Sequence, residues 1–155
     1  MDQLRRTAVA LVLAEQPTHE LPLLAAEALA RGVDSPALRT LAGLSRTDAC
    51  RDIFWQAMAE LGFPQPDTET AWRHRMIWAA QSLVEGERSP YDASDEIYWC
   101  ASHLDQSPRT ESVTHRFLDL QLAWEAHRGQ APAVERQMRE AAIALLRASP
   151  DVPRP

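Results

Sequence analysis

Proline and glycine divide this sequence into short segments, and this division constrains the fold more than any other feature. Within the segments, apolar residues recur every three or four positions, which is the period of an amphipathic helix. We find no segment that alternates between apolar and polar residues, as a half-buried strand does. The connectors are short, so neighbouring helices should pack together. The pattern predicts an all-α fold: a single compact multi-helix bundle of about eight helices with no sheet.

Start and stop signals place the helices. Ser35-Pro36 and Ser89-Pro90 each combine an N-cap serine with proline at the first helical position. Glycine or proline follows most of the segments and ends them. The predicted helices span residues 2–15, 20–31, 36–43, 47–62, 67–84, 90–104, 110–127 and 132–148. We expect one helical domain over residues 1–149 and a frayed, proline-rich tail over residues 150–155.

The amino-acid composition supports the helical prediction and limits the classes of partner that the protein can bind. Alanine (25) and leucine (18) together far outnumber valine, isoleucine and threonine, which total 19. This balance favours helices and excludes a β-sandwich or barrel. Lysine and asparagine are absent, which is typical of a high-GC bacterial genome, so arginine carries every fixed positive charge. The net charge of −6 favours cationic partners over nucleic acid or an anionic membrane. No apolar run reaches the length of a membrane span, and the two cysteines match no metal or redox spacing, so we expect a cytoplasmic protein with reduced thiols.

One segment superficially resembles a helix-turn-helix DNA-binding motif. A helix ending at Gly43 is followed by Ser45-Arg46-Thr47, which starts another helix. However, Arg39 occupies the position where such motifs place a small residue. Asp48 and Asp52 on the second helix would repel phosphate. DNA binding is therefore the third hypothesis, and two packed core helices explain the same residues.

Two polar stripes suggest a metal- or ligand-dependent enzyme as the alternative function. Glu111, His115 and Asp119 share one face of a predicted helix, and His103 lies on the helix before it. These side chains are possible ligands of a divalent ion. Polar residues at helical spacing are also typical of a solvated face. The sequence has no glycine-rich phosphate loop, zinc signature or nucleophile elbow, so we predict no catalytic residue and no cofactor.

The tryptophans carry the leading functional hypothesis. Trp55, Trp78 and Trp99 each lie off the apolar arc of their helix, whereas Trp124 shares the core face of its own. The three off-arc rings lie on the acidic or histidine-bearing side of their helices; the acidic candidates are Asp48, Asp52, Asp92, Asp95 and Glu96. Either each ring fills a second packing seam, or the rings form a surface on these three helices that binds a partner.

The second interpretation predicts a non-catalytic protein-binding module. Aromatic faces beside carboxylates favour a protein partner with a basic surface, through cation–π contacts and charge complementarity. One concrete version is an immunity-type neutraliser of a basic toxin. The sequence does not predict the oligomeric state.

The central part of the chain resembles a known group of proteins. The segments Leu24-Ala25-Ala26-Glu27-Ala28-Leu29, Leu41-Ala42-Gly43-Leu44 and Leu61-Gly62-Phe63-Pro64 are similar to those of small, uncharacterised all-helical actinobacterial proteins. The resemblance implies a helical fold and a bacterial source. It implies no activity and no site residue.

Overall fold

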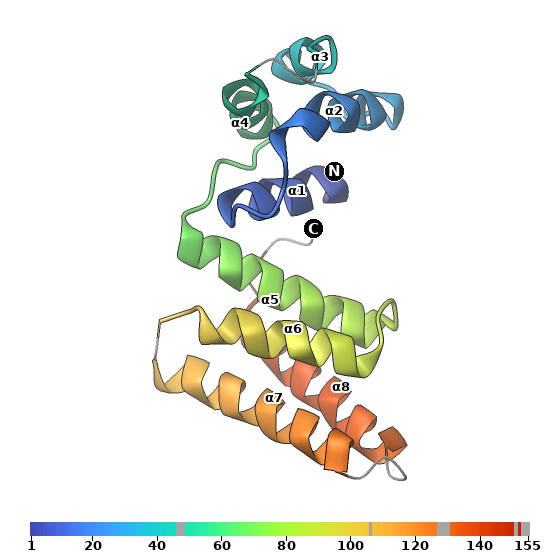
Figure 1. Ribbon diagram of the computed structural model, residues 1–155, viewed down its shortest axis with the longest axis vertical. Helices are drawn as coiled ribbons and strands as arrows, with labels where there is room; N and C mark the ends of the chain where they lie inside the picture. The colour runs from blue at the N-terminus through green and yellow to red at the C-terminus, as the bar shows by residue number, and fades with distance from the viewer. Residues whose placement is uncertain (46–48, 106, 127–130, 151, 153–155) are drawn as a thin grey trace. The chain divides into compact units, whose positions relative to one another are not determined.

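The computed structural model describes residues 1–45, 49–105, 107–126, 131–150 and 152. Within these ranges the chain has eight α-helices, one 3₁₀ turn and no strand, which confirms the predicted all-α fold class. The elements are α1 (Asp2–Val12), η1 (Thr18–Glu20), α2 (Leu21–Ala30), α3 (Pro36–Ala42), α4 (Cys50–Glu60), α5 (Thr68–Glu85), α6 (Pro90–Ser102), α7 (Pro108–Ala126) and α8 (Ala131–Arg147) (Figure 1). Of the predicted frayed tail, only Pro150 and Val152 are described.

The two Ser-Pro pairs start helices as predicted. The Ser35 hydroxyl oxygen accepts a hydrogen bond from the Leu38 N–H at 3.2 Å, and Pro36 is the first residue of α3. The Ser89 hydroxyl does the same for the Asp92 N–H at the start of α6, also at 3.2 Å. Each serine satisfies one backbone donor that the first helical turn leaves without a partner.

Helix α1 ends earlier than predicted, because the chain turns at Ala14 rather than at Pro17. Ala14 has a left-handed backbone conformation, with φ of 58°. Its N–H donates to the Leu11 carbonyl at 3.3 Å, and the Glu15 N–H donates to the Ala10 carbonyl at 2.8 Å. These two bonds form a Schellman motif, which usually has glycine at the left-handed position. Helices α2, α4 and α5 end in the same way, with Gly32, Gly62 and Gly86 at that position.

We predict that Ala14→Gly stabilises the protein. The Cβ of alanine disfavours the left-handed conformation, and glycine removes that penalty at some cost in unfolded-chain entropy. We expect the free energy of unfolding to rise by about 1 kcal/mol, measured by urea denaturation. The matched control is Gly32→Ala, where an added Cβ meets no atom within 4 Å but the φ of 83° stays unfavourable. Gly32→Ala should lower the free energy of unfolding. If Gly32→Ala stabilises the protein and Ala14→Gly destabilises it, this explanation of the helix end is wrong.

The described helices form two compact units. Met1–Ala71 contains α1 to α4, and Trp72–Arg154 contains most of α5 and all of α6 to α8. Helix α5 starts in the first range and continues into the second. The prediction of one domain over residues 1–149 means that these residues unfold in a single cooperative transition. It stays a prediction, and the unfolding of mutants can test it.

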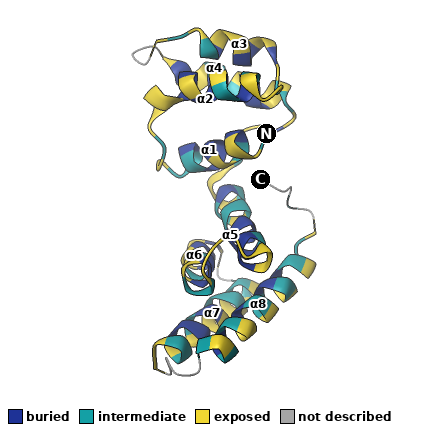
Figure 2. Ribbon diagram, turned by 90° about the vertical axis from the view of Figure 1, so that its right-hand side faces the viewer, coloured by how far each residue is buried: buried dark blue, intermediate teal, exposed yellow. Residues whose placement is uncertain are grey.

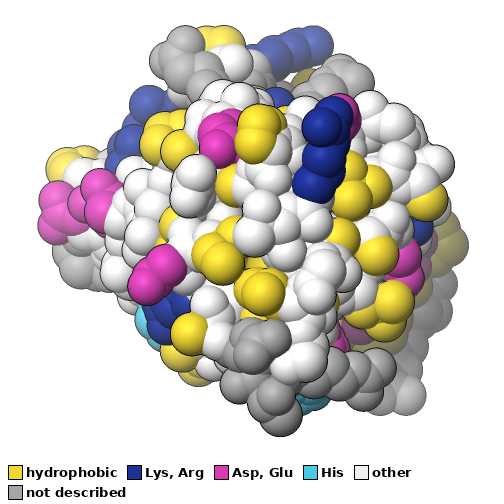
Figure 3. Space-filling view, turned by 90° about the horizontal axis from the view of Figure 1, so that it is seen from above, with side chains coloured by type: hydrophobic (Ala, Val, Ile, Leu, Met, Phe, Trp, Pro, Cys, Tyr) yellow, Lys and Arg dark blue, Asp and Glu magenta, His cyan; other side chains and the backbone are white. Residues whose placement is uncertain are grey.

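In the first unit, α2 packs against α3, and α3 packs against α4. Helices α1 and α2 also contact α4. Fully buried side chains from each helix meet in the interior, among them Leu4, Leu21, Leu38 and Phe54. Figure 3 views this unit at its α3 end, where acidic side chains are spread among apolar and polar ones.

Glu60, at the end of α4, ties that helix to the start of α3. Its Oε2 accepts a hydrogen bond from the Ala37 N–H at 3.0 Å. This N–H is one of the donors that the first turn of α3 leaves without a helical partner. The bond to Ala37 is the main cause that lowers the pKa of Glu60 below its ordinary value, and a bond from the Ser35 hydroxyl adds to it.

The Glu60 contact predicts an acid-sensitive contribution to stability. Because the folded-state pKa is lowered, the ionised carboxylate stabilises the fold above the ordinary pKa of 4.5, and this contribution is lost as the pH falls through the lower folded value. Glu60→Gln, which resembles the protonated acid, should be less stable than wild type at pH 7 and equally stable in strong acid. Chemical denaturation at both pH values measures the difference. Glu87→Gln, at an exposed loop position, should change stability little at either pH.

In the second unit, α6 packs against both α7 and α8, and α7 packs against α8. Helix α5 completes the core, which is coloured dark blue in Figure 2. Its largest fully buried side chains are Ile77, Leu83, Ile97, Phe117 and Met138. Cys100 lies in this core and Cys50 is buried in the first unit, and the two cysteines form no disulfide with each other.

Candidate protein-binding surface

Helix α6 has one buried face and one polar face. Its apolar residues Ala93, Ile97, Cys100 and Ala101 are all fully buried in the core, as predicted. At helical spacing, the opposite face carries Asp92, Asp95, Glu96, Trp99 and, just beyond the last turn, His103. Trp99 is 54% exposed, which is unusual for an aromatic ring of this size. These five residues are called the α6 face below.

Two further rings lie behind Trp99, one tilted against it and the next stacked on the first. The His103 ring lies 4.7 Å from the Trp99 ring and 4.3 Å from the Trp72 ring of α5, almost parallel to the latter. The His103 Nδ1 lies 2.8 Å from the Trp99 carbonyl oxygen. Because a carbonyl only accepts, Nδ1 must carry a proton and donate it. The stacking and this bond fix the imidazole against Trp99, so the exposed indole rests on an ordered support.

Glu96 is already engaged by two arginines. Its Oε1 accepts a hydrogen bond from the Arg75 Nε at 2.7 Å, and its Oε2 accepts one from Arg88. Arg75 also lies over the Trp72 ring, 5.8 Å from its centroid. The Glu96 side chain is only 18% exposed. Its charge is therefore neutralised within the protein, and it contributes to the structure of the α6 face rather than to its net charge.

Asp92 and Asp95 keep exposed carboxylates on the same face. Asp92 accepts a hydrogen bond from the Ser89 hydroxyl at 2.5 Å, and Asp95 accepts one from the Gln121 amide of α7 at 3.1 Å. Neither partner is charged, so both negative charges are available to a cation from outside. Trp99 thus has two ordered carboxylates along its own helix.

The three off-arc tryptophans do not share one environment. Trp78 is only 3% exposed and lies 5.6 Å from the His74 ring, so the packing-seam interpretation holds for it. Trp55 is half-buried, with its ring edge against Phe54, and its buried Nε1 has no hydrogen-bond partner among the described residues. The prediction that Trp78 faces a partner is therefore wrong, and of the three rings Trp99 is the one that is largely exposed.

Two of the acidic candidates, Asp48 and Asp52, belong to the first unit in sequence. Asp52 is exposed on α4, which belongs to the first unit together with Trp55. Asp48 lies outside the described residues. The candidate surface uses residues of the second unit alone.

The structure does not bring the metal-ligand candidates together. Glu111, His115 and Asp119 are exposed along α7, and the His103 ring is stacked on Trp72 and tilted against Trp99. Over the described part of the chain, no group of three or more His, Cys, Asp or Glu side chains is arranged to hold a metal ion.

Sequence reasoning missed three members of the site. They are Trp72, Arg75 and Gln121. The spacing of Trp99 and His103 by four residues predicts that their rings meet on one helix face. The contacts from Trp72, Arg75 and Gln121 join different helices, and helical periodicity does not predict such contacts.

No family model, curated protein or solved structure matches this chain. The resemblance to small actinobacterial helical proteins therefore stays a prediction. Among the described residues, no helix is both long and apolar enough to cross a membrane.

Proposed function

We propose that this protein is a non-catalytic binding module whose α6 face receives arginine or lysine side chains of a basic protein partner. The observation that carries the proposal is the exposed Trp99 ring, held by His103 beside the carboxylates of Asp92 and Asp95. Tryptophan is the best aromatic acceptor of a cation and is enriched at interaction hot spots.

Charge supports the same class of partner. On α6, Asp92 and Asp95 keep exposed carboxylates, whereas Glu96 is neutralised by Arg75 and Arg88. The whole chain carries a net charge of −6. Such a field speeds the encounter with a positively charged protein. A neutraliser of a basic toxin is the specific form we favour. Two buried, reduced cysteines fit a reducing compartment, and we propose the cytoplasm.

The experiment titrates the full chain with a short arginine-rich peptide and follows binding by isothermal calorimetry and amide NMR shifts. We expect saturable, salt-sensitive binding, with the largest shifts on α6. Trp99→Leu keeps an apolar side chain but removes the ring, and it should weaken binding about fivefold, whereas Trp99→Phe should retain part of the affinity. Leu23→Ala is the matched control, because Leu23 is also 54% exposed but lies on α2.

Three results would reject the proposal. The first is equal peptide affinity for Trp99→Leu and wild type with unchanged circular dichroism. The second is equal binding of a glutamate-rich peptide of the same length. The third is an arginine-rich peptide that shifts residues outside α6 only.

A further inference from the structure

The acidic surface of α6 continues onto α7. The Tyr91 hydroxyl of α6 donates a hydrogen bond to Glu125 of α7 at 2.5 Å, and the Gln121 amide of α7 donates one to Asp95 of α6 at 3.1 Å. As the residue number rises along α6, that of the bonded α7 residue falls, so the two helices lie side by side and antiparallel (Figure 1). Glu125 therefore lies at the end of α6 that carries Asp92 and Asp95.

Tyr91 senses the combined charge of three carboxylates. Its bond to Glu125 is the main cause that raises the pKa of Tyr91 above its ordinary value, and burial is the next. The negative charges of Glu125, Asp95 and Asp92 raise this pKa further, because each disfavours the ionised phenol. Carboxylates from both helices are thus concentrated around the start of α6.

Leu122 adds an exposed apolar side chain to the same region. It is 55% exposed and Trp99 is 54% exposed, and they are two of the four large apolar side chains that are exposed in the described part of the chain. Leu122 precedes Glu125 by three residues on α7, and Trp99 follows Asp95 by four on α6. Each apolar side chain therefore has a carboxylate about one turn away on its own helix. The α6–α7 surface is defined by Asp92, Asp95, Trp99, Leu122 and Glu125.

The arginines next to α6 do not neutralise the α6–α7 surface. Helix α6 contains no arginine, and Arg75 and Arg88 both bind Glu96. Within the described residues, the hydrogen bonds to the three carboxylates of this surface come from neutral groups: a serine hydroxyl, a glutamine amide and a tyrosine hydroxyl. Three negative charges are therefore available to cations of a partner.

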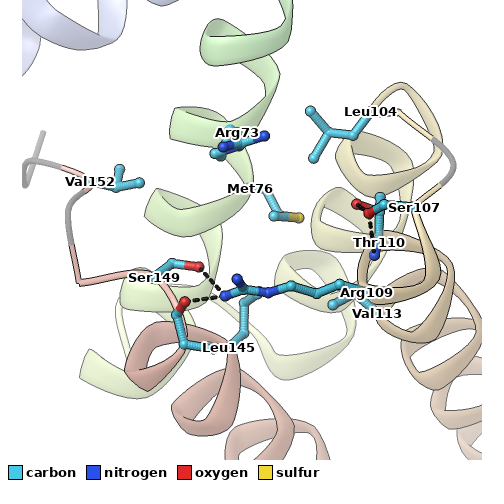
Figure 4. Close-up of a pocket in the computed structure, with 11 residues that line it drawn as sticks. Arg73, Met76, Leu104, Ser107, Arg109, Thr110, Val113, Leu145, Ser149 and Val152 are labelled. Carbon is cyan, nitrogen blue, oxygen red and sulfur yellow. Dashed lines mark hydrogen bonds between the residues drawn. The ribbon is translucent and has the colours of Figure 1, made fainter.

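The two arginines of α7 do not neutralise it either. Arg109 lies in the first turn of α7, at the far end from Leu122, and its Nη2 donates to a backbone carbonyl and to the Ser149 hydroxyl just after α8 (Figure 4). Arg116 is exposed six residues before Leu122, on another side of the helix, and Asp119 three residues after it offsets its charge. The negative charge of the α6–α7 surface is thus not compensated from α7.

The mixture of apolar and acidic groups favours a helical partner. A single arginine side chain would pair with a carboxylate but leave Trp99 or Leu122 in contact with water. An amphipathic helix instead presents an apolar stripe with polar residues along both sides. When those flanking residues are basic, the stripe covers both apolar side chains while the cations meet the surrounding carboxylates.

We propose that the α6–α7 surface binds an amphipathic, basic α-helix of a partner protein. The apolar stripe of that helix covers Trp99 and Leu122, and its flanking arginines or lysines meet Asp92, Asp95 and Glu125. This inference rests on the proposed function and adds the form of the partner: an ordered helical face rather than any arginine-rich segment.

The test compares two peptides of identical length and composition, built from arginine, leucine and alanine. In one, the leucines form a single stripe of a helix; in the other, they are scattered around it. Isothermal calorimetry on the full chain should show about tenfold tighter binding of the striped peptide, with amide NMR shifts on both α6 and α7. Leu122→Ala should weaken binding of the striped peptide about fivefold and change that of the scattered peptide little. Leu23→Ala, at an equally exposed leucine of α2, is the matched control and should change neither.

The outcomes separate this inference from the proposed function. If the two peptides bind equally and both lose affinity in Trp99→Leu, the helical partner is rejected and the basic partner stands. If neither peptide binds the wild-type chain, both proposals are rejected. The helical partner is also rejected if the striped peptide shifts α6 alone, or if Leu23→Ala weakens its binding as much as Leu122→Ala.

Discussion

Phe54→Ala and Phe117→Ala should each lower the free energy of unfolding by about 3–5 kcal/mol, the usual cost of removing a buried phenylalanine ring. Phe54 is fully buried in the first unit and Phe117 in the second, at 0% and 1% exposure, so the two substitutions are matched in chemistry and burial. Each removes the ring's burial and leaves a cavity that its neighbours fill only in part. Urea denaturation followed by circular dichroism measures the loss.

The pair also tests the prediction of one domain over residues 1–149. Helix α5 runs through the boundary between the units and supplies Ile77 and Leu83 to the second core, so we expect both variants to shift one common transition. A biphasic curve, in which Phe54→Ala moves one half of the signal and Phe117→Ala the other, would instead show two independent domains.

Glu96→Gln should destabilise the protein by about 2 kcal/mol, between the values typical of exposed and of buried ion pairs. The reason is that the substitution leaves Arg75 and Arg88 close together without their shared carboxylate. The Arg75 and Arg88 side chains are 30% and 42% exposed, so water solvates them and offsets part of the lost interaction free energy. Chemical denaturation at neutral pH measures the change.

Asp95→Asn is the matched control for Glu96→Gln. It removes a charge from the next residue of α6 but keeps an oxygen that accepts the Gln121 hydrogen bond. We expect a change below about 0.5 kcal/mol, as for most surface positions. Combining Glu96→Gln with Arg88→Gln should recover part of the stability, because it removes one of the two crowded cations. Equal effects of Glu96→Gln and Asp95→Asn would contradict a structural role for the ion pairs.

Local chemistry explains why most helix boundaries were predictable. An N-cap serine followed by proline, as at Ser35 and Ser89, acts within one turn of helix, and so does a glycine after the last turn. The end of α1 was missed for the same reason: Ala14 takes the left-handed position without the glycine that marks it in sequence.

The functional residues were predictable only in part. Helical periodicity places Trp78 and Trp99 off the apolar arcs of α5 and α6 in the same way. It does not say which side of a helix another helix covers, and Trp78 is buried while Trp99 is exposed. Glu96 was expected to face a partner, but Arg75 and Arg88 bind it instead.

The sequence by itself determined the all-α class, most helix ends and the buried face of α6, because these depend on groups a few residues apart. Only the tertiary structure decided which tryptophan is exposed and which acidic residue is neutralised. Those outcomes depend on packing between helices, and packing brings together side chains that are far apart along the chain.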